Sequence, residues 1–192
     1  MKIIGVLAFH GDVIEHIETT KKAAKNLHLD LEVVPVRTKE IIQTLDALII
    51  PGGESTTLFK LCQRENMWED MKKVKNIFGT CAGAILLAKK VFHKTADQKT
   101  LELMDIEIDR NAYGRQTDSF EKDIKTSLGN IHAIFIRAPR IKRVGKAVKI
   151  LARNKREVIA CEQTTGNNYY LAACFHPELT STIFHEHFLK KI

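Results

Sequence analysis

The stretch IFGTCAGAILL, residues 77–87, predicts a strand, a sharp turn and a helix. Cys81 stands at the predicted turn between Gly79 and Gly83, in a G-x-C-x-G pattern that is the cysteine version of a nucleophile elbow. Glycines allow a backbone course that larger residues would strain. The unpaired N–H groups and the dipole at a helix start favour a thiolate, the reactive form of cysteine. Cys81 is therefore a candidate nucleophile, and the alternative is a buried structural cysteine.

A second motif supplies a candidate base and its orienting partner. His176-Pro177-Glu178 follows the apolar run YYLAAC, residues 169–174, which is typical of a buried strand. In an extended segment, residues two apart project to the same side, and proline stiffens the link between them. A thiol nucleophile needs a base, and the base needs an orienting group. Cys81, His176 and Glu178 would fill these three roles.

A third motif, PGGESTT at residues 51–57, ends the short apolar strand predicted at 47–50. Paired glycines let backbone N–H groups approach a ligand closely, so this turn is a candidate for oxyanion donors. A helix beginning near Ser55 or Thr56 would have an ordinary capping residue, and a turn with a helix cap is the simpler interpretation. All three motifs lie at the carboxyl end of a predicted strand, which is where open α/β sheets bind ligands.

Composition and charge narrow the class of protein. The 192 residues are 44% hydrophobic and 28% charged, as in a globular protein, and we expect a single domain over residues 1–192. No apolar run approaches the length of a membrane span, and no signal peptide is evident, so we expect a cytoplasmic protein without membrane association. The four cysteines lack metal or disulfide spacing and are expected to be reduced thiols. The net charge of +7 is spread over separate lysine pairs without interleaved aromatic residues, which argues against nucleic-acid binding.

The order of predicted elements indicates an α/β fold. Strands at 2–9, 31–36, 47–50 and 76–80 alternate with helical segments at 12–27, about 57–75 and from the elbow to about residue 90, which indicates a doubly wound, mostly parallel sheet. The second half predicts strands joined by short links, as antiparallel extensions of this sheet, and a closing helix at about 181–190. These strands are predicted at 103–109, 116–124, 131–136, 148–154, 157–163 and 169–175.

The elbow and the His-Pro-Glu motif together resemble the class I (triad) glutamine amidotransferases. Further stretches narrow the resemblance to the glutaminase subunits of pyridoxal 5'-phosphate synthase, across essentially the whole chain. These stretches are PGGESTT (51–57), RNAYGRQ (110–116), DSFE (118–121), IRAP (136–139) and HPELT (176–180). The resemblance implies the flavodoxin-like architecture of the class I enzymes.

The resemblance also implies roles for single residues. Cys81 would be the nucleophile, with His176 and Glu178 completing the triad. The backbone N–H groups of Gly53 and Ala82 would form the oxyanion hole. The glutamine-binding positions would be Gly53, Glu54, Ser55, Arg110, Ile136 and Arg137. Glutamine is a zwitterion, so arginines for its carboxylate and Glu54 for its ammonium are chemically sensible.

The implied reaction is hydrolysis of L-glutamine to L-glutamate and ammonia through a γ-glutamyl thioester, with no metal or organic cofactor. The implied partner is a synthase subunit, in a hetero-oligomeric complex, that receives the ammonia through a tunnel. The sequence departs from the family at His10, where a Leu-x-Gln-Gly stretch is usual; in the family this glutamine lies by the oxyanion hole and helps to couple activity to the synthase subunit.

Three alternatives remain open from the sequence alone. The chain could be the glutaminase of another pathway, such as histidine, anthranilate or nucleotide synthesis, which would share the triad but lack the RNAYGRQ and IRAP stretches. It could be a cysteine-elbow stress protein or a protease-like relative, although the His-Pro-Glu motif argues against this class. It could also be a catalytically silent regulatory subunit.

Overall fold

The computed structural model describes residues 1–110 and 119–192. The motif residues 111–116 and Asp118, which contributed to the resemblance, lie outside the described residues. The first three predicted strands of the parallel sheet are close to their expected bounds. A strand with apolar residues throughout is typical of a sheet covered on both faces, and every residue of the strand at Ala47–Ile50 is buried.

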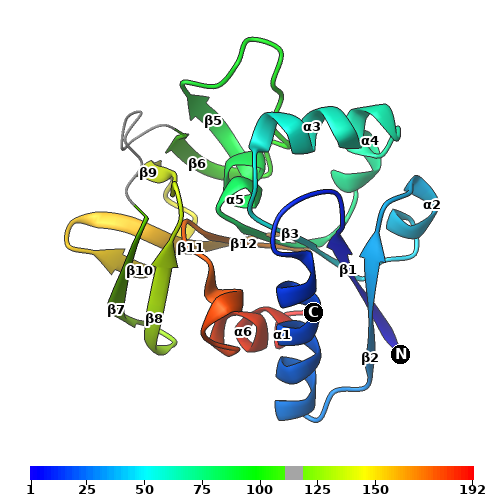
Figure 1. Cartoon of the computed structure of the whole chain (residues 1–192), viewed down its shortest axis with the longest axis horizontal. Helices are drawn as coiled ribbons and strands as arrows, with labels where there is room; N and C mark the ends of the chain where they lie inside the picture. The colour runs from blue at the N-terminus through cyan, green and yellow to red at the C-terminus, as the bar shows by residue number, and fades with distance from the viewer. Residues whose placement is uncertain (111–118) are drawn as a thin grey trace.

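The centre of the molecule is a parallel sheet with strand order β2-β1-β3-β4-β12. Its strands are β1 (Lys2–Leu7), β2 (Leu31–Val36), β3 (Ala47–Ile50), β4 (Asn76–Thr80) and β12 (Asn168–Ala173). In Figure 1 helices α1 and α6 lie on one side of this sheet, and α3, α4 and α5 lie on the other. The helices are α1 (Val13–Asn26), α2 (Lys39–Ile42), α3 (Ser55–Arg64), α4 (Trp68–Met71), α5 (Ala82–Leu87) and α6 (Ile183–Leu189).

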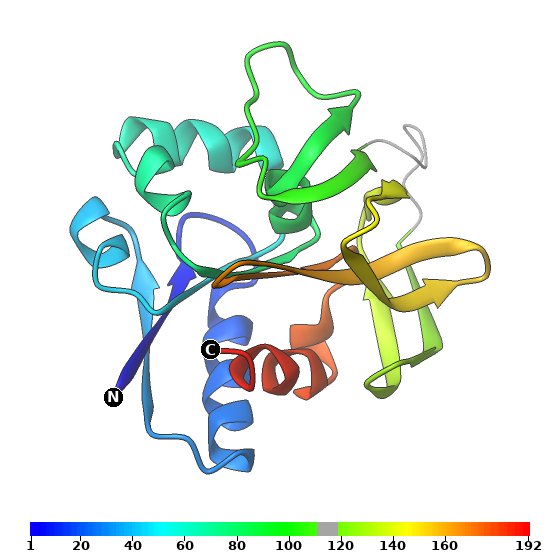
Figure 2. The same ribbon diagram turned by 180° about the vertical axis from the view of Figure 1, so that it is seen from behind.

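The sheet continues beyond β12 as antiparallel strands in the order β11-β10-β7-β8. These are β7 (Phe120–Thr126), β8 (Gly129–Phe135), β10 (Val148–Asn154) and β11 (Glu157–Thr165). Three further strands leave this path: β5 (Ala88–Phe92) pairs with β6 (Met104–Asp109), and β9 (Arg140–Val144) joins β6 to β11. Figure 2, the view from behind, shows β5 and β6 rising from the same side as α3. The predicted α/β fold, with a parallel sheet and antiparallel extensions, is confirmed.

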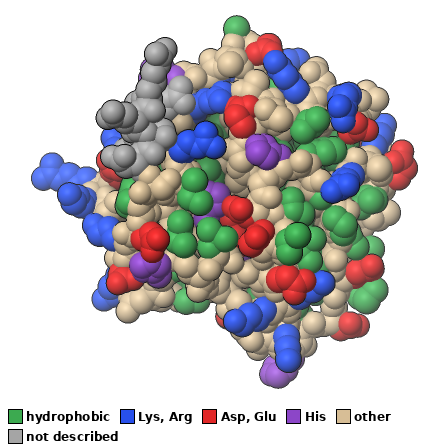
Figure 3. All heavy atoms as spheres, in the orientation of Figure 1, with side chains coloured by type: hydrophobic (Ala, Val, Ile, Leu, Met, Phe, Trp, Pro, Cys, Tyr) green, Lys and Arg blue, Asp and Glu red, His purple; other side chains and the backbone are tan. Residues whose placement is uncertain are grey.

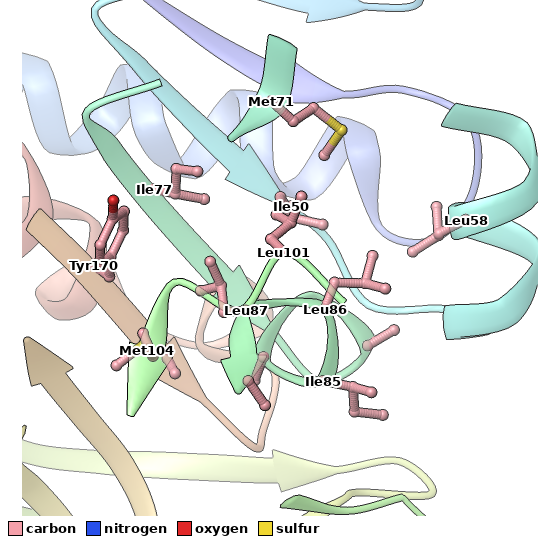
Figure 4. Packing of buried hydrophobic residues seen from close by; sticks show 14 of the residues in the cluster. Ile50, Leu58, Met71, Ile77, Ile85, Leu86, Leu87, Leu101, Met104 and Tyr170 are labelled. Carbon is pink, nitrogen blue, oxygen red and sulfur yellow. The ribbon is translucent and has the colours of Figure 1, made fainter. Parts of the chain in front are cut away.

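Alternating side chains of the central strands enter two separate hydrophobic clusters. In β3, Leu48 and Ile50 point into the cluster under α3 and α5, whereas Ala47 and Ile49 point into the cluster under α1 and α6. Figure 4 shows the first cluster, which Ile50 and Ile77 of the sheet share with Leu86 and Leu87 of α5. Burial of one such aliphatic side chain contributes roughly 1.5–3 kcal/mol, so the two clusters fix the sheet and its strand ends firmly.

The structure corrects three details of the prediction. The helix after the elbow ends at Leu87 and does not reach residue 90, because residues 88–92 form β5 against β6. The carbonyls of Leu86 and Leu87 accept from the N–H groups of Leu101 and Leu103, respectively. Strand β9 was not predicted, because its pairing with β6 and β11 is visible only in three dimensions. Strand β7 begins at Phe120 and ends at Thr126, whereas 116–124 was expected; residues 116–118 lie outside the described part of the chain.

The surface charges are mixed in sign and the cysteines are unpaired, as the composition indicated. Figure 3 shows lysine and arginine side chains mixed with acidic ones over the face in view. No helix formed by the described residues is long and apolar enough to cross a membrane. All four cysteines are free thiols, as predicted. One sheet runs through the described parts of the chain, while the single domain over residues 1–192 stays a prediction.

Candidate active site

Cys81 lies at a strained turn between β4 and α5. Its φ of 49° and ψ of −103° lie in a region that a non-glycine residue rarely adopts, at a cost of about 1–3 kcal/mol. The Cys81 N–H donates to the carbonyl of Ala173 in β12 (2.8 Å), which anchors the turn to the sheet. A Cβ on Gly83 would lie 2.0 Å from the Ile50 carbonyl oxygen, so only glycine lets α5 begin this close to β3. The elbow geometry expected from the sequence is present.

His176 and Glu178 lie beside each other at the carboxyl end of β12. His176 Nδ1 is 2.8 Å from Glu178 Oε1, and both side chains are buried. The sequence predicted that an extended segment would bring them to the same side, and this detail is wrong. Proline at the first position instead begins a 3-10 turn, η1 (Pro177–Leu179), and this turn brings Glu178 back onto the imidazole.

Charge at this pair is strongly biased toward the ionised forms. Burial disfavours the His176 imidazolium, but the nearby Cys81 sulfur and the Glu178 carboxylate outweigh it and raise the pKa of His176 to about 10. Burial also opposes ionisation of Glu178, yet His16 and His176 hold the pKa of this carboxyl well below its usual range. His176 Nε2 is buried and makes no hydrogen bond to the described residues, which leaves this edge of the ring for Cys81 chemistry. The site therefore favours an imidazolium paired with the Glu178 carboxylate.

The glycine-rich turn after β3 closes one side of the site. A Cβ on Gly52 would lie 2.5 Å from Cε1 of His176, so the turn packs directly on the base. Gly53 has a φ of 119°, and the ring of His10 lies against it. Ala82 is the first residue of α5, where N–H groups have no partner within the helix. Ala82 thus directly follows Cys81, and Gly53 directly follows the residue that packs on His176; the role of both as oxyanion donors stays a prediction.

Glu54 and Arg110, two predicted glutamine-binding residues, bond to each other. Glu54 is also the N-cap of α3 and accepts from the N–H groups of Thr56 (3.0 Å) and Thr57 (2.7 Å). Burial opposes ionisation, but these bonds and Arg110 lower the pKa of Glu54 to about 2. Helix α3 begins at Ser55, as the sequence predicted, and its N-cap is Glu54, one residue earlier.

A buried glutamine that the sequence analysis missed completes this cluster. Gln98 donates to Ser55 Oγ (3.0 Å) and accepts from Arg110 Nη1 (2.9 Å). Arg110 Nη1 also donates to Thr56 Oγ1 (2.7 Å). Nothing in the pattern around Gln98 marks it, because its partners come from α3 and from the end of β6. The cluster holds Glu54, Ser55 and Arg110 in one polar group.

The remaining predicted binding residues, Ile136 and Arg137, follow β8. The Cys81 thiol donates to the carbonyl of Ile136, with 3.8 Å between sulfur and oxygen. Residue Ile136 is 37% exposed, and Arg137 is exposed with a φ of 45°. The loop after β8 therefore borders the nucleophile, as expected for a substrate-facing segment.

Asp12 is a second residue that sequence reasoning missed. Its Oδ2 lies 2.9 Å from His176 Nδ1, so this nitrogen faces two carboxylates. The position of Asp12, after β1 at the carboxyl edge of the sheet, could have marked it. Asp12, His176 and Glu178 have potential metal-ligand atoms within 4.8 Å of one another. The close contacts of Nδ1 with the two carboxylates already account for this cluster, as a carboxylate–imidazole unit.

A cavity of about 480 Å³ lies at the opposite edge of the sheet. Lys2, Asp46 and Asn76 line it, and these residues stand at the amino ends of strands β1, β3 and β4. The three chemical motifs lie at the carboxyl ends of the same sheet, so this cavity is separate from the site.

A cysteine elbow, a buried His–Glu pair and an α/β sheet define a triad hydrolase with a thiol nucleophile. Residues 6–192 match the model of the SNO glutamine amidotransferase family, and the chain belongs to this family. It is therefore a glutamine amidotransferase.

Named relatives and one solved structure agree with this assignment. The chain is 45% identical to the pyridoxal 5'-phosphate synthase subunit PdxT of Pyrococcus horikoshii and 46% identical to that of Pyrococcus furiosus, with 98% of each chain covered. A crystal structure described as a glutamine amidotransferase superposes with a TM-score of 0.82 at 41% identity, covering 98% of this chain and 97% of that one. These similarities extend over the whole length and are not confined to the elbow.

Proposed function

We propose that this chain hydrolyses L-glutamine to L-glutamate and ammonia at Cys81, and delivers the ammonia to the synthase subunit of a pyridoxal 5'-phosphate synthase. The observation that carries the proposal is the assembled constellation: Cys81 at a strained elbow, facing a His176 that is bonded to Glu178 at 2.8 Å. Full-length similarity to PdxT proteins supports this pathway over those of other triad glutaminases.

The first half of the reaction forms a thioester. The Cys81 thiolate attacks the side-chain amide carbon of glutamine, and N–H groups of Gly53 and Ala82 stabilise the oxyanion. His176 Nε2 donates a proton to the amide nitrogen, and the C–N bond breaks to release ammonia. Glu178 keeps the imidazole oriented through Nδ1, as the carboxylate of a triad does.

The second half regenerates the enzyme. His176 Nε2, now neutral, takes a proton from a water molecule that attacks the γ-glutamyl thioester. The carbon–sulfur bond breaks, glutamate leaves, and the Cys81 thiolate returns to its pairing with the imidazolium. The described residues supply every proton transfer in this cycle.

Substrate recognition is assigned to the groups around the elbow. Arg110 and Arg137 offer cations to the glutamine carboxylate, and Glu54 offers an acceptor to the ammonium. Because Glu54 and Arg110 bond to each other here, binding would exchange part of this contact for contacts with the substrate. Ser55 and the Ile136 backbone border the same space.

The proposed setting is a hetero-oligomeric complex with the synthase subunit, in the cytoplasm. Four free thiols are typical of a reducing compartment. His10, which lies against Gly53 of the proposed oxyanion loop, stands where the family usually has glutamine. We expect the isolated chain to have low activity and the synthase to raise it.

Glutamate release from glutamine, with and without the synthase subunit, tests this proposal. Activity should rise when the synthase is added, and Cys81→Ala should lower kcat by at least about a thousandfold, as for other triad nucleophiles. Activity that survives in Cys81→Ala would contradict the mechanism. A parent protein without glutaminase activity in either condition would indicate a different partner or a silent subunit.

A further inference from the structure

Two buried histidines stand in line behind Glu178. His16 Nε2 lies 3.3 Å from Glu178 Oε1, and His16 Nδ1 lies 2.9 Å from His185 Nε2. Both histidine side chains have an exposed fraction of 0%. His16 belongs to α1 and His185 to α6, two helices that lie together beneath the sheet in both Figure 1 and Figure 2. None of the catalytic steps above uses either histidine.

The hydrogen-bond pattern fixes where the protons lie. A carboxylate accepts only, so His16 Nε2 must carry the proton that faces Glu178, which it shares with the Thr80 hydroxyl at 3.0 Å. His185 Nδ1 has no hydrogen bond to the described residues, and a bare nitrogen there costs less than a buried unpaired N–H. His185 therefore carries its proton on Nε2 and donates it to His16 Nδ1. Burial lowers the pKa of His185 to about 3, which keeps this ring neutral.

Every donor in this line points toward Glu178. The order is His185 to His16, then His16 to the carboxylate, which accepts from His176 at the same oxygen, Oε1. Polarised hydrogen bonds in a low-dielectric interior strengthen each other. An unpaired carboxylate as deeply buried as Glu178 would otherwise protonate.

Asp12 competes with Glu178 for the proton on His176 Nδ1, and the two histidines favour Glu178. His176 Nδ1 has one proton, and the Asp12 and Glu178 carboxylates both lie within 2.9 Å of it. The Asp12 side chain is 33% exposed and water can hold its charge, whereas Glu178 depends on protein donors. A donor behind Glu178 offsets the repulsion between the two carboxylates and fixes the buried one on the imidazole.

We propose that His16, supported by His185, is a positioning residue that holds the Glu178 carboxylate ionised and aligned on His176, and so stabilises the thiolate–imidazolium pair of Cys81. The proposal rests on the proposed catalytic role of this triad, but its test does not require glutamine. The titratable groups that face this line from the packed elements are Asp12, Cys81, His176 and Glu178.

The test is the rate of Cys81 alkylation by iodoacetamide as a function of pH, with Cys81→Ala giving the background from the other thiols. In His16→Leu the imidazolium loses support, so the midpoint of the alkylation curve should rise by about one pH unit. The kcat for glutamine should fall roughly tenfold or more with little change in KM, because a hydrogen bond to a buried charge is lost. His16→Gln, whose amide N–H can reach the Nε2 position, should restore most of both values.

Two further variants keep the test decisive. Thr20→Val removes another buried polar group from the same face of α1, a hydroxyl that donates to the His16 carbonyl. This variant should match the parent in alkylation midpoint and kcat. His185→Leu leaves the His16–Glu178 contact in place and should shift the midpoint in the same direction by less. It decides the question if His16→Leu does not fold.

The outcomes separate cleanly. A parental midpoint and kcat in folded His16→Leu, or in His185→Leu where His16→Leu does not fold, would overturn the proposal and reduce these histidines to packing. A midpoint that shifts as expected, in a parent without glutaminase activity, would support the positioning role and count against the proposed function alone.

Discussion

The parallel and antiparallel halves of the sheet differ in how their strands are enclosed. Every residue of β3 is buried, and four of the five residues of β4 are buried. In β7 of the antiparallel half, only Ile124 and Thr126 are buried, while three consecutive charged residues face solvent. The enclosed half carries the nucleophile and its base, and the open half supplies the loop whose Ile136 carbonyl meets the thiol. Reactive groups need fixed positions, whereas a binding edge needs access.

The largest difference between the halves is expected in catalysis. Glu178→Gln keeps the shape of the side chain but removes the charge that supports the His176 imidazolium. We expect kcat/KM for glutamine to fall by about 10³–10⁴, as when the orienting carboxylate of other triads is changed. Asp123→Asn, on exposed β7, is the control and should retain parental activity. A Glu178→Gln enzyme within tenfold of the parent would break the comparison.

Stability should show the next largest contrast. Gly83→Ala places a Cβ 2.0 Å from a backbone oxygen of β3, and such overpacking costs about 1–3 kcal/mol. Gly166→Asn, in the β11–β12 turn, meets no atom within 4 Å, and asparagine tolerates its φ of 57°. Thermal unfolding should therefore show a clear loss of Tm only for Gly83→Ala. Equal losses would mean that the elbow is no more tightly packed than a surface turn.

Arg110 tests the division between chemistry and binding. Arg110→Met removes a cation at the end of β6 without touching Cys81 or His176. We expect KM for glutamine to rise roughly tenfold or more, with a smaller change in kcat, because a charged hydrogen bond to substrate is lost. The pH dependence of Cys81 alkylation should stay parental. A fall in kcat at constant KM would place Arg110 in the chemistry instead.

The smallest effect is expected on the open hairpin. Exposed His132 lies 2.8 Å from Glu121 and 2.7 Å from Asp123, and hydrogen bonds to these two carboxylates raise its pKa. Its contribution to stability is therefore present in full below about pH 6.5 and is lost as the pH rises through the raised value. His132→Asn should lower Tm slightly at pH 6 and leave it unchanged at pH 9, with parental activity throughout. A change at pH 9 alone would contradict this sign.

The same contrast explains what the sequence could predict. In the enclosed half, the strands at 47–50 and 76–80 are short apolar stretches that run into glycine-containing turns, and the strand at 31–36 is rich in valine, so all three could be predicted with their bounds. Strand β9, with three basic residues out of five, depends on partners far along the chain and could not be. Cys81, His176 and Glu178 stand in local motifs. His16 and His185 meet only when α1 and α6 pack beside each other, so no local motif marks them, and Asp12 is marked only by its place after β1.

The register between β4 and β12 has a consequence for how this chain can vary in length. Ala173 pairs with Thr80, and its carbonyl accepts from the Cys81 N–H. The pairing of β4 with β12 therefore fixes the position of the nucleophile relative to the base. One residue of strand spans about 3.3 Å, and a slip by one residue also reverses the faces of its side chains. Insertions and deletions should therefore be tolerated in the turn at Gly166 but not in residues 168–176, where one added residue would separate the two reacting groups.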